Sequence, residues 1–424
     1  MKKNTKFRRS RQPRARRSSK GERGPEGEIL DLRRRLRETL INHLRTAVAS
    51  TAQALVEDEV LALVGEPWSR KGTSPLRRNG VTTSTIHLDG EPCSLVRGRV
   101  RDRSRGSEVP LATLQALASR DALDADVHRR LIRGVSTRNY DDALGALADG
   151  WGLKKSAVSA AFVRASKKDL DLLNGRPLGE MTFVTVFLDG TFFADHTCLV
   201  ALGITQDGKK VVLGLRDGAS ENSELVKDLL ADLVERGLTL TRRALFVLDG
   251  SKALAKAVRA AFGDQAVIQR CILHKLRNVL SYLPPSRHAE ARRRLNVAWG
   301  MTSYGDALEE LEKVKTWLAS INESAAGSLA EALEETVTVH RLGLTGALRK
   351  TLLTTNPVES AIEIVKHHAR RVRRWNGSSM VLRWTAAGLV RAEQQFRRVK
   401  GHHQIPQLIT ALQNVSLNNS KDVA

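Results

Sequence analysis

The sequence predicts an α/β protein, and three observations carry this prediction. From Met181 onward, three β-rich runs are separated by short glycine turns, which is typical of an antiparallel meander. A helix, a strand, a second helix and a further strand follow, ending at Cys271. Amphipathic helical periodicity dominates the chain before and after this region, so helical segments should flank the sheet.

Length and charge restrict the class of protein. The chain has 424 residues, more than one hydrophobic core usually organises, so we expect two to four structural units. It carries 69 Lys and Arg against 46 Asp and Glu, a formal net charge of +23. A polyanion such as nucleic acid is the commonest partner of so basic a chain, with membrane lipid as the main competitor. No apolar run could span a bilayer or serve as a secretion signal, which predicts a protein that stays inside the cell.

Residues 1–28 are predicted to be a disordered basic arm. They have almost no large apolar side chains, and ten of the first twenty residues are Lys or Arg. Such an arm could contact DNA phosphates, or it could be a solvated tail that only aids solubility.

Residues 29–112 are predicted to be a helical and β region. Apolar residues recur at helical spacing from Ile29 to Val64, which indicates one or two amphipathic helices that could pair with another subunit. Short segments between glycine and charged turns suggest a small β element over residues 75–111.

Residues 113–178 are predicted to resemble a helix-turn-helix. Three short helices are expected, the last two joined by a turn from Asp149 to Leu153. The segment from Lys154 to Ala165, which includes Lys155, is the candidate recognition helix for a DNA major groove. A plain packing role is the alternative.

Residues 179–275 are predicted to form the first part of a catalytic core. Three strands followed by helix, strand, helix and strand is the element order of an RNase H-like domain. In that topology the first and fourth strands are parallel neighbours, so acids at their ends meet in one crevice. These acids are Asp189 in FLDG and Asp249 in FVLDG. Either Asp-Gly pair alone would more often be a turn, but its repetition on neighbouring strands favours a site.

A third acid, Glu359, opens a predicted helix after a Thr-Thr-Asn-Pro start signal. Carboxylates are the ligands that Mg²⁺ prefers, and Mn²⁺ could take its place. Two carboxylates about 4 Å apart repel by roughly 4 kcal/mol at an effective dielectric of 20, so the cluster needs a cation. Two ions would form a clamp for in-line displacement at phosphorus.

The motifs of residues 181–401 together resemble the Mutator-type transposases of bacterial insertion sequences. The segments that carry the resemblance, in order, include FLDGTFF, FVLDGSKALAKAV, IQRCILHKLRNVL, TTNPVES and RRVRRWNGSSMVLRW. The resemblance implies an RNase H-like transposase with Asp189, Asp249 and Glu359 as its metal-binding acids. It also implies terminal inverted repeats and target DNA as partners, a homodimer or higher oligomer on DNA, and a bacterial, nucleoid-associated, cytoplasmic location.

The resemblance also implies a Cys-x-x-His signature at Cys271 and His274 and a helical insertion at residues 276–352. His274 could contact the scissile phosphate or a nucleophilic water. Cys271 reads as a packed small residue, because no second ligand pair stands nearby to complete a zinc site. Within the insertion, Trp299 and Trp317 could stack on an unpaired base or belong to the core.

Residues 353–401 are predicted to form the final catalytic helix and a basic DNA-binding region, with a tail at 402–424. Because basic residues follow Glu359 directly, they should line the DNA path, although a solvated face is the alternative. The predicted contacts, expected first along the helix and then beyond it, are Lys366, Arg370, Arg371, Arg373, Arg374, Arg383, Arg397 and Arg398.

Two other hypotheses compete with an active transposase. A non-catalytic DNA-binding regulator would bind without cleaving, but retention of all three acids argues against it. A structure-selective nuclease on the same fold would need neither the basic arm nor a helix-turn-helix.

Overall fold

The computed structural model describes residues 25–68, 74–88, 91–118, 121–135, 155–193, 195–218 and 223–414. They form two compact units, one up to residue 118 and the other from residue 121 onward. Most of the predicted basic arm, the turn expected at 149–153, Lys154 and the end of the tail lie outside the described residues. Within those residues, no helix combines the length and the apolarity that crossing a bilayer requires.

The first unit packs a long helix against a small antiparallel sheet. The helical stretch, expected as one or two helices, is a single helix, α1 (Pro25–Val64). The predicted β element is confirmed as the sheet β1 (Leu76–Leu88), β2 (Glu91–Asp102) and β3 (Ser107–Glu108). The second half of α1 contributes Ala52, Val56, Val60 and Val64 to the core. The Glu59 carboxylate accepts the backbone N–H groups of Ala112 and Thr113, which begin α2 (Ala112–Ala118).

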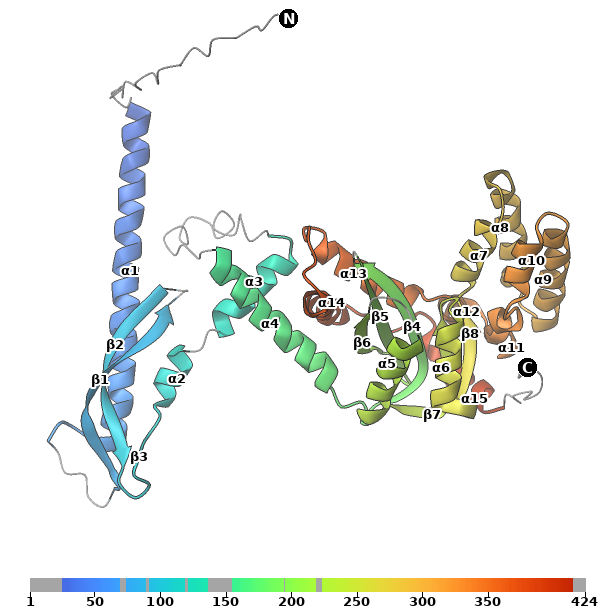
Figure 1. Ribbon diagram of the computed structural model, residues 1–424. Coiled ribbons are helices and arrows are strands. Elements are labelled where there is room, and N and C mark those ends of the chain that lie inside the picture. The colour runs from blue at the N-terminus through green and yellow to red at the C-terminus, as the bar shows by residue number, and fades with distance from the viewer. Residues whose placement is uncertain are drawn as a thin grey trace, which may run out of the picture. The chain divides into compact units, whose positions relative to one another are not determined.

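The second unit is built on a five-stranded sheet (Figure 1). The predicted meander is confirmed as β4 (Thr182–Phe193), β5 (His196–Thr205) and β6 (Lys210–Gly218). Two further strands, β7 (Thr239–Leu248) and β8 (Ala266–Arg270), pair parallel, and β7 also pairs parallel with β4. The order is β6-β5-β4-β7-β8, so the first and fourth strands are neighbours as expected.

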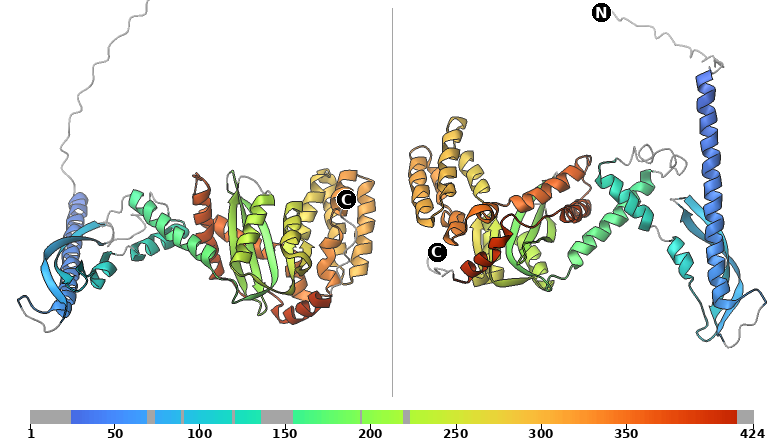
Figure 2. Two further views of the ribbon diagram at one scale, coloured as in Figure 1. Left: turned by 60° about the horizontal axis from the view of Figure 1, so that its bottom comes forward. Right: turned by 180° about the vertical axis from the view of Figure 1, so that it is seen from behind.

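Helices cover both faces of this sheet, which explains why its strands are apolar on both sides (Figure 2). On one face, α5 (Ser223–Glu235) and α6 (Lys252–Phe262) pack on residues such as Phe183 and Phe246. On the other face, α13 (Asn356–Ala369), α14 (Ser378–Glu393) and α15 (Ile405–Asn414) enclose a core that includes Phe187 and Val200.

Two helices precede the sheet within this unit. α3 (Asp121–Ile132) packs on α4 (Lys155–Gly175), which also packs on α14. α4 continues ten residues beyond the expected end of the recognition helix. Its residues Val158, Ala161 and Phe162 are buried, and Phe162 packs on Trp384 of α14 with ring centroids 4.4 Å apart. One face of this helix is therefore a packing face.

A helical bundle interrupts the sheet domain between β8 and α13 (Figure 1). It consists of α7 (Ile272–Ser281), α8 (Pro285–Gly300), α9 (Tyr304–Ala319) and α10 (Glu323–Ala330), and the chain returns through α11 (Thr338–Arg341) and α12 (Gly346–Leu352). Trp299 is 2% exposed in its core, and its Nε1 donates to Thr336 Oγ1 at 3.2 Å. Trp299 is thus a core residue that cannot stack on a base.

Helix α13 ends earlier than the sequence suggested. The prediction that Arg371, Arg373 and Arg374 continue this helix is wrong, because it ends at Ala369 and these residues lie in the connection to α14. Trp375 in that connection packs against Phe193 at the end of β4, with ring centroids 5.0 Å apart. This tertiary contact outweighs the helical propensity of the arginine run.

Candidate functional site

The site begins where strands β4 and β7 stop pairing. Their last register pair is Leu188 with Leu248, and each of these leucines is followed by an aspartate. Parallel neighbours lie about 4.8 Å apart, so the backbones that carry Asp189 and Asp249 are adjacent. The parallel pairing of β4 with β7 therefore brings Asp189 and Asp249 to the same edge of the pair.

Asp189 lies within a strand, although its Asp-Gly sequence suggests a turn residue at the end of one. Strand β4 continues to Phe193, because residues 189–193 keep pairing with β5 after pairing with β7 has ended. Asp189 is only 3% exposed, and its Oδ1 accepts the backbone N–H of Gly190 at 3.1 Å. A buried carboxylate with so little compensation is costly unless another group neutralises it.

Glu359 comes from the first turn of α13, which packs against β4 and β5. Pro357 in the first turn and Thr355 at the N-cap confirm the predicted helix start. The Thr355 hydroxyl lies 3.2 Å from Glu359 Oε1. A buried N-terminal turn thus orients this carboxylate toward the sheet.

His274 joins the two acids. It lies on α7, which begins directly after β8, and its Nε2 is 3.8 Å from Glu359 Oε1. One ligand atom each from Asp189, His274 and Glu359 lies within 4.8 Å of the others. Asp249 stands outside this closest group among the described residues. It is near enough, however, for its charge to raise the pKa of both Asp189 and His274.

The pKa values of Asp189 and His274 are both raised in this cluster. Burial raises the pKa of Asp189 to about 7, the charges of Asp249 and Glu359 add to the rise, and His274 opposes it. A hydrogen bond with Cys271 raises the pKa of His274 to about 9, helped by the charges of the aspartates and opposed by burial. Arg277 Nη1 lies 3.7 Å from Glu359 Oε1. Cationic side chains therefore partly balance the carboxylates.

Cys271 is more than the packed apolar residue that the sequence suggested. It is 1% exposed, but its Sγ accepts the Thr355 backbone N–H at 3.4 Å. Burial alone would raise the pKa of this thiol, yet hydrogen bonds with His274 and Thr355 lower it overall. Its backbone N–H donates to the carbonyl of Leu248 at 2.7 Å, which places Cys271 beside the chain leading to Asp249.

The loop that carries Asp249 is held from the helical bundle. Asp249 Oδ1 accepts the backbone N–H of Ser251 at 2.8 Å, and the Ser251 carbonyl accepts from Arg270 Nη1 at 2.9 Å. Arg270 Nε in turn donates to Glu335 Oε2 at 2.6 Å, and both side chains are largely buried. Gly250 lies close to Asn278 of α7: a Cβ here would be 2.7 Å from Asn278 Nδ2, so a larger residue would displace that side chain.

The predicted DNA-contact residues lie in two places. Most lie on α13, in the connection to α14 or on α14, whereas Arg397 and Arg398 precede Val399, whose backbone N–H donates to the Gly208 carbonyl in the turn between β5 and β6. Because Trp375 packs on Phe193, the connection between α13 and α14 lies beside the end of the strand that carries Asp189. Arg383 on α14 is half-buried, and the side chain of Lys155 lies outside the described part. The exposed basic residues are Lys366, Arg370, Arg371, Arg373, Arg374, Arg397 and Arg398.

Sequence reasoning missed three residues of this site: Thr355, Arg277 and Arg270. Thr355 was visible only as part of a helix start signal. Arg277 follows His274 at a spacing of three on one helix, a signal that could have found it. Arg270 acts across 65 residues of sequence, which no local pattern reveals.

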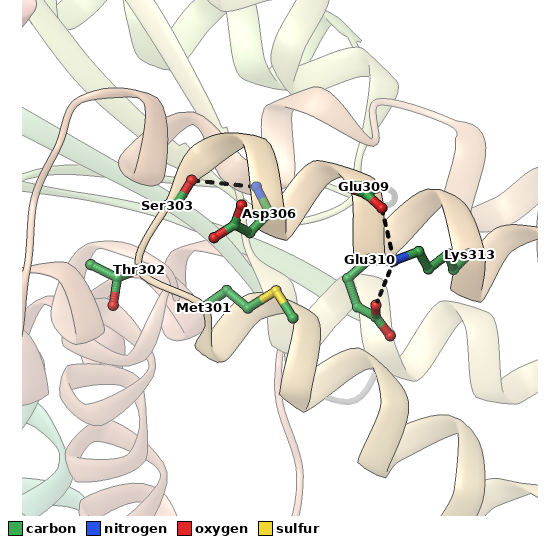
Figure 3. A pocket seen from close by; sticks show the side chains of 7 residues that line it. All are labelled: Met301, Thr302, Ser303, Asp306, Glu309, Glu310 and Lys313. Carbon is green, nitrogen blue, oxygen red and sulfur yellow. Dashed lines mark hydrogen bonds and ion pairs between the residues drawn. The ribbon is translucent and has the colours of Figure 1, made fainter.

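A shallow pocket lies in the helical bundle, away from these acids. Figure 3 shows its lining at the start of α9, where Lys313 forms ion pairs with Glu309 and Glu310. Because it lies away from the acids, we assign it no role in the chemistry.

Comparison with known proteins gives one consistent result. The family described as "Transposase, Mutator family" matches residues 29–399. The chain is 26% identical over 342 residues to the transposase for insertion sequence element IS905 of Lactococcus lactis subsp. lactis (strain IL1403), covering 77% of this chain and 83% of that protein. It is 27% identical over 242 residues to the transposase for insertion sequence element IS6120 of Mycolicibacterium smegmatis, covering 55% and 73%.

Proposed function

Because the chain belongs to the Mutator family of transposases, we propose that it cuts the ends of its own insertion sequence and joins the freed ends to target DNA. The sheet order β6-β5-β4-β7-β8, with β4 and β7 parallel, supports an RNase H-like catalytic domain. The bundle between β8 and α13 is the helical insertion of that domain.

The observation that carries this proposal is the convergence of Asp189 and Glu359. They are 170 positions apart in sequence, yet their ligand atoms lie within 4.8 Å of each other and of His274. Asp249 follows the parallel neighbour of Asp189, so it completes a set of three acids at the edge of the β4–β7 pair.

These residues fit divalent metal ions. Asp189 is buried among other acids, and its pKa is raised first by this burial and then by the charges of Asp249 and Glu359, so a cation bound there would be favourable. Carboxylates of Asp189, Asp249 and Glu359 would hold Mg²⁺ or Mn²⁺, two ions for each site. Bound there, the ions would activate the attacking oxygen and stabilise the leaving oxygen in an in-line displacement at phosphorus.

The proposed reaction has two steps at phosphorus. In the first step the oxygen of a water attacks phosphorus, the bond to the 3′ oxygen breaks, and this oxygen takes up a proton to leave a 3′-hydroxyl. In the second step that hydroxyl attacks a phosphate of the target in the same way. His274 borders the acids and would orient the scissile phosphate or the attacking water.

DNA would reach the acids along the exposed basic residues from Lys366 to Arg374. Arg397 and Arg398, next to the turn between β5 and β6, would contact DNA farther from the acids. The contact of Trp375 with Phe193 supports this path, because it brings the arginines of the connection beside β4. The exposed face of α4 is the remaining candidate for reading the terminal inverted repeats. Such binding would keep the protein with the nucleoid.

Two element ends must be held together, so we propose that the protein acts as a dimer or higher oligomer. Leu32, Leu36 and Leu40 on α1 are each at least half exposed and recur every four residues. This spacing puts them along one side of the helix, where a second copy could cover them.

The experiment is to incubate the purified protein with DNA that carries its element ends and to map the nicks. We expect cuts at the terminal repeats with Mg²⁺ or Mn²⁺ and none with EDTA. Specific binding without nicks under either metal would favour a non-catalytic regulator, and nicks at branched DNA of any sequence would favour a nuclease.

A further inference from the structure

The hydroxyl of Thr355 lies at the centre of the site, although no step of the chemistry uses it. Thr355 is fully buried at the N-cap of α13. Its Oγ1 lies 3.2 Å from Glu359 Oε1, 3.4 Å from His274 Nδ1 and 3.4 Å from Cys271 Sγ. One side chain therefore contacts an acid, the histidine and the thiol together.

Hydrogen-bond chemistry limits how these contacts can be shared. A threonine hydroxyl has one proton to donate and two lone pairs. A carboxylate is the strongest acceptor within reach, so the proton goes to Glu359. The Cys271 sulfur already accepts the backbone N–H of Thr355. A lone pair of the hydroxyl is then free to accept from Nδ1–H of His274.

This arrangement fixes the histidine as well as the acid. With Nδ1 directed at the Thr355 hydroxyl, the ring turns Nε2 toward the acids, and Nε2 is the atom that lies 3.8 Å from Glu359. Partners of this kind, which hold the groups next to a metal without touching it, typically set the affinity of the site.

We propose that Thr355 is a positioning residue: its hydroxyl holds Glu359 and the ring of His274 in the geometry that receives a divalent ion. This inference rests on the proposed function. It adds a residue that acts through its neighbours and contacts neither substrate nor metal.

The chain offers a matched set of variants for the test. Thr355→Val keeps the shape of the side chain and removes the hydroxyl, and Thr355→Ser restores the hydroxyl. The control is Thr354→Val at the adjacent residue, which is also buried but whose hydroxyl instead accepts the backbone N–H of Asn356 at 3.4 Å. Circular dichroism and thermal unfolding would confirm that each variant folds.

The first measurement is Mn²⁺ binding by calorimetry on the full chain. We expect Thr355→Val to weaken binding by about 10- to 100-fold, and Thr355→Ser and Thr354→Val to remain close to wild type. Equal affinity of Thr355→Val and wild type would overturn the inference while leaving the proposed function intact. If wild type itself bound no Mn²⁺, the metal-dependent function would be contradicted and the inference with it.

The second measurement needs no metal. In protein labelled with ¹⁵N-histidine, the resonances of His274 are identified by their loss in His274→Gln. We expect the His274 Nδ1 signal to shift in Thr355→Val, to return in Thr355→Ser and to stay in place in Thr354→Val. An unchanged Nδ1 signal in Thr355→Val would show that the hydroxyl does not hold the ring.

Discussion

Gly388 of α14 lies directly against Val365 of α13: a Cβ on Gly388 would be 2.8 Å from Val365 Cγ2 and 2.9 Å from Val365 Cα. The two helices therefore cross at a point where only glycine fits. Because α13 carries Glu359 in its first turn, this crossing helps to set the position of the third acid.

Gly388→Ala should destabilise the protein by about 1–3 kcal/mol, because the added methyl group forces α13 and α14 apart. Thermal or urea unfolding measures the effect. Gly327→Ala is the control, since the corresponding position on α10 has nothing within 4 Å. It should be neutral or stabilising by up to about 1 kcal/mol. Equal effects of the two substitutions would show that the close crossing is wrong.

Trp299→Phe should lower stability without changing DNA affinity. The substitution removes the hydrogen bond to Thr336 and leaves a small gap, which together cost about 1–2 kcal/mol. Chemical denaturation and fluorescence anisotropy with labelled DNA measure the two quantities. A loss of DNA affinity in a variant that stays folded would instead revive a role in base stacking.

The metal-free protein should become less stable as the pH rises from 4 to 9. The pKa of Asp189 is raised to about 7, so its stabilising contribution is complete below its ordinary pKa of 3.8 and is lost as the pH rises through 7. Raising the pKa of one carboxyl this far corresponds to roughly 4 kcal/mol. His274, with its pKa raised to about 9, loses its contribution in the same direction between pH 6.5 and 9.

Mn²⁺ should therefore raise the melting temperature more at pH 8 than at pH 6, because the ion replaces the lost protons. Scanning fluorimetry with and without Mn²⁺ tests this. Asp189→Asn should flatten the pH dependence of the metal-free protein between pH 5 and 7. A metal effect that is equal at both pH values would contradict the pKa assignment.

Replacing Arg373 and Arg374 together by Gln should weaken DNA binding and reduce its dependence on salt. Each phosphate contact contributes about 0.9 to the slope of log affinity against log salt, so the slope should fall by about 1–2. The control replaces Arg292 and Arg293, an equally exposed pair on α8 of the helical bundle. If both double variants changed the slope equally, the arginines of the connection would be only a solvated face.

Sequence reasoning found the parts of this protein that local patterns encode. Strand alternation and glycine turns located β4 to β6, and the Thr-Thr-Asn-Pro signal located the start of α13. The repeated Leu-Asp-Gly motif pointed to Asp189 and Asp249, because parallel strands align the residues that follow them. Helical periodicity and glycine turns also indicated the positions of α1 and of the small sheet β1 to β3.

What escaped prediction depends on contacts between distant segments. Helix α13 ends at Ala369, before the connection in which Trp375 packs on Phe193, and no property of the arginine run reveals this end. Continued pairing with β5 keeps Asp189 within a strand although pairing with β7 has stopped. The role of Thr355 follows from a hydrogen bond to Cys271, 84 residues away in sequence. The role of Arg270 follows from a hydrogen bond to Ser251, 19 residues away.

The central claim is that Asp189, Asp249 and Glu359 together drive DNA cleavage, and a strand-cleavage assay with Asp189→Asn, Asp249→Asn and Glu359→Gln tests it most directly. Each substitution keeps the size of the side chain and removes its charge, so cleavage should fall on the order of 10³-fold while DNA binding persists. Asp264→Asn, at an exposed acid beyond α6, should cut like wild type. Cleavage by all three acid variants at the wild-type rate would contradict the account.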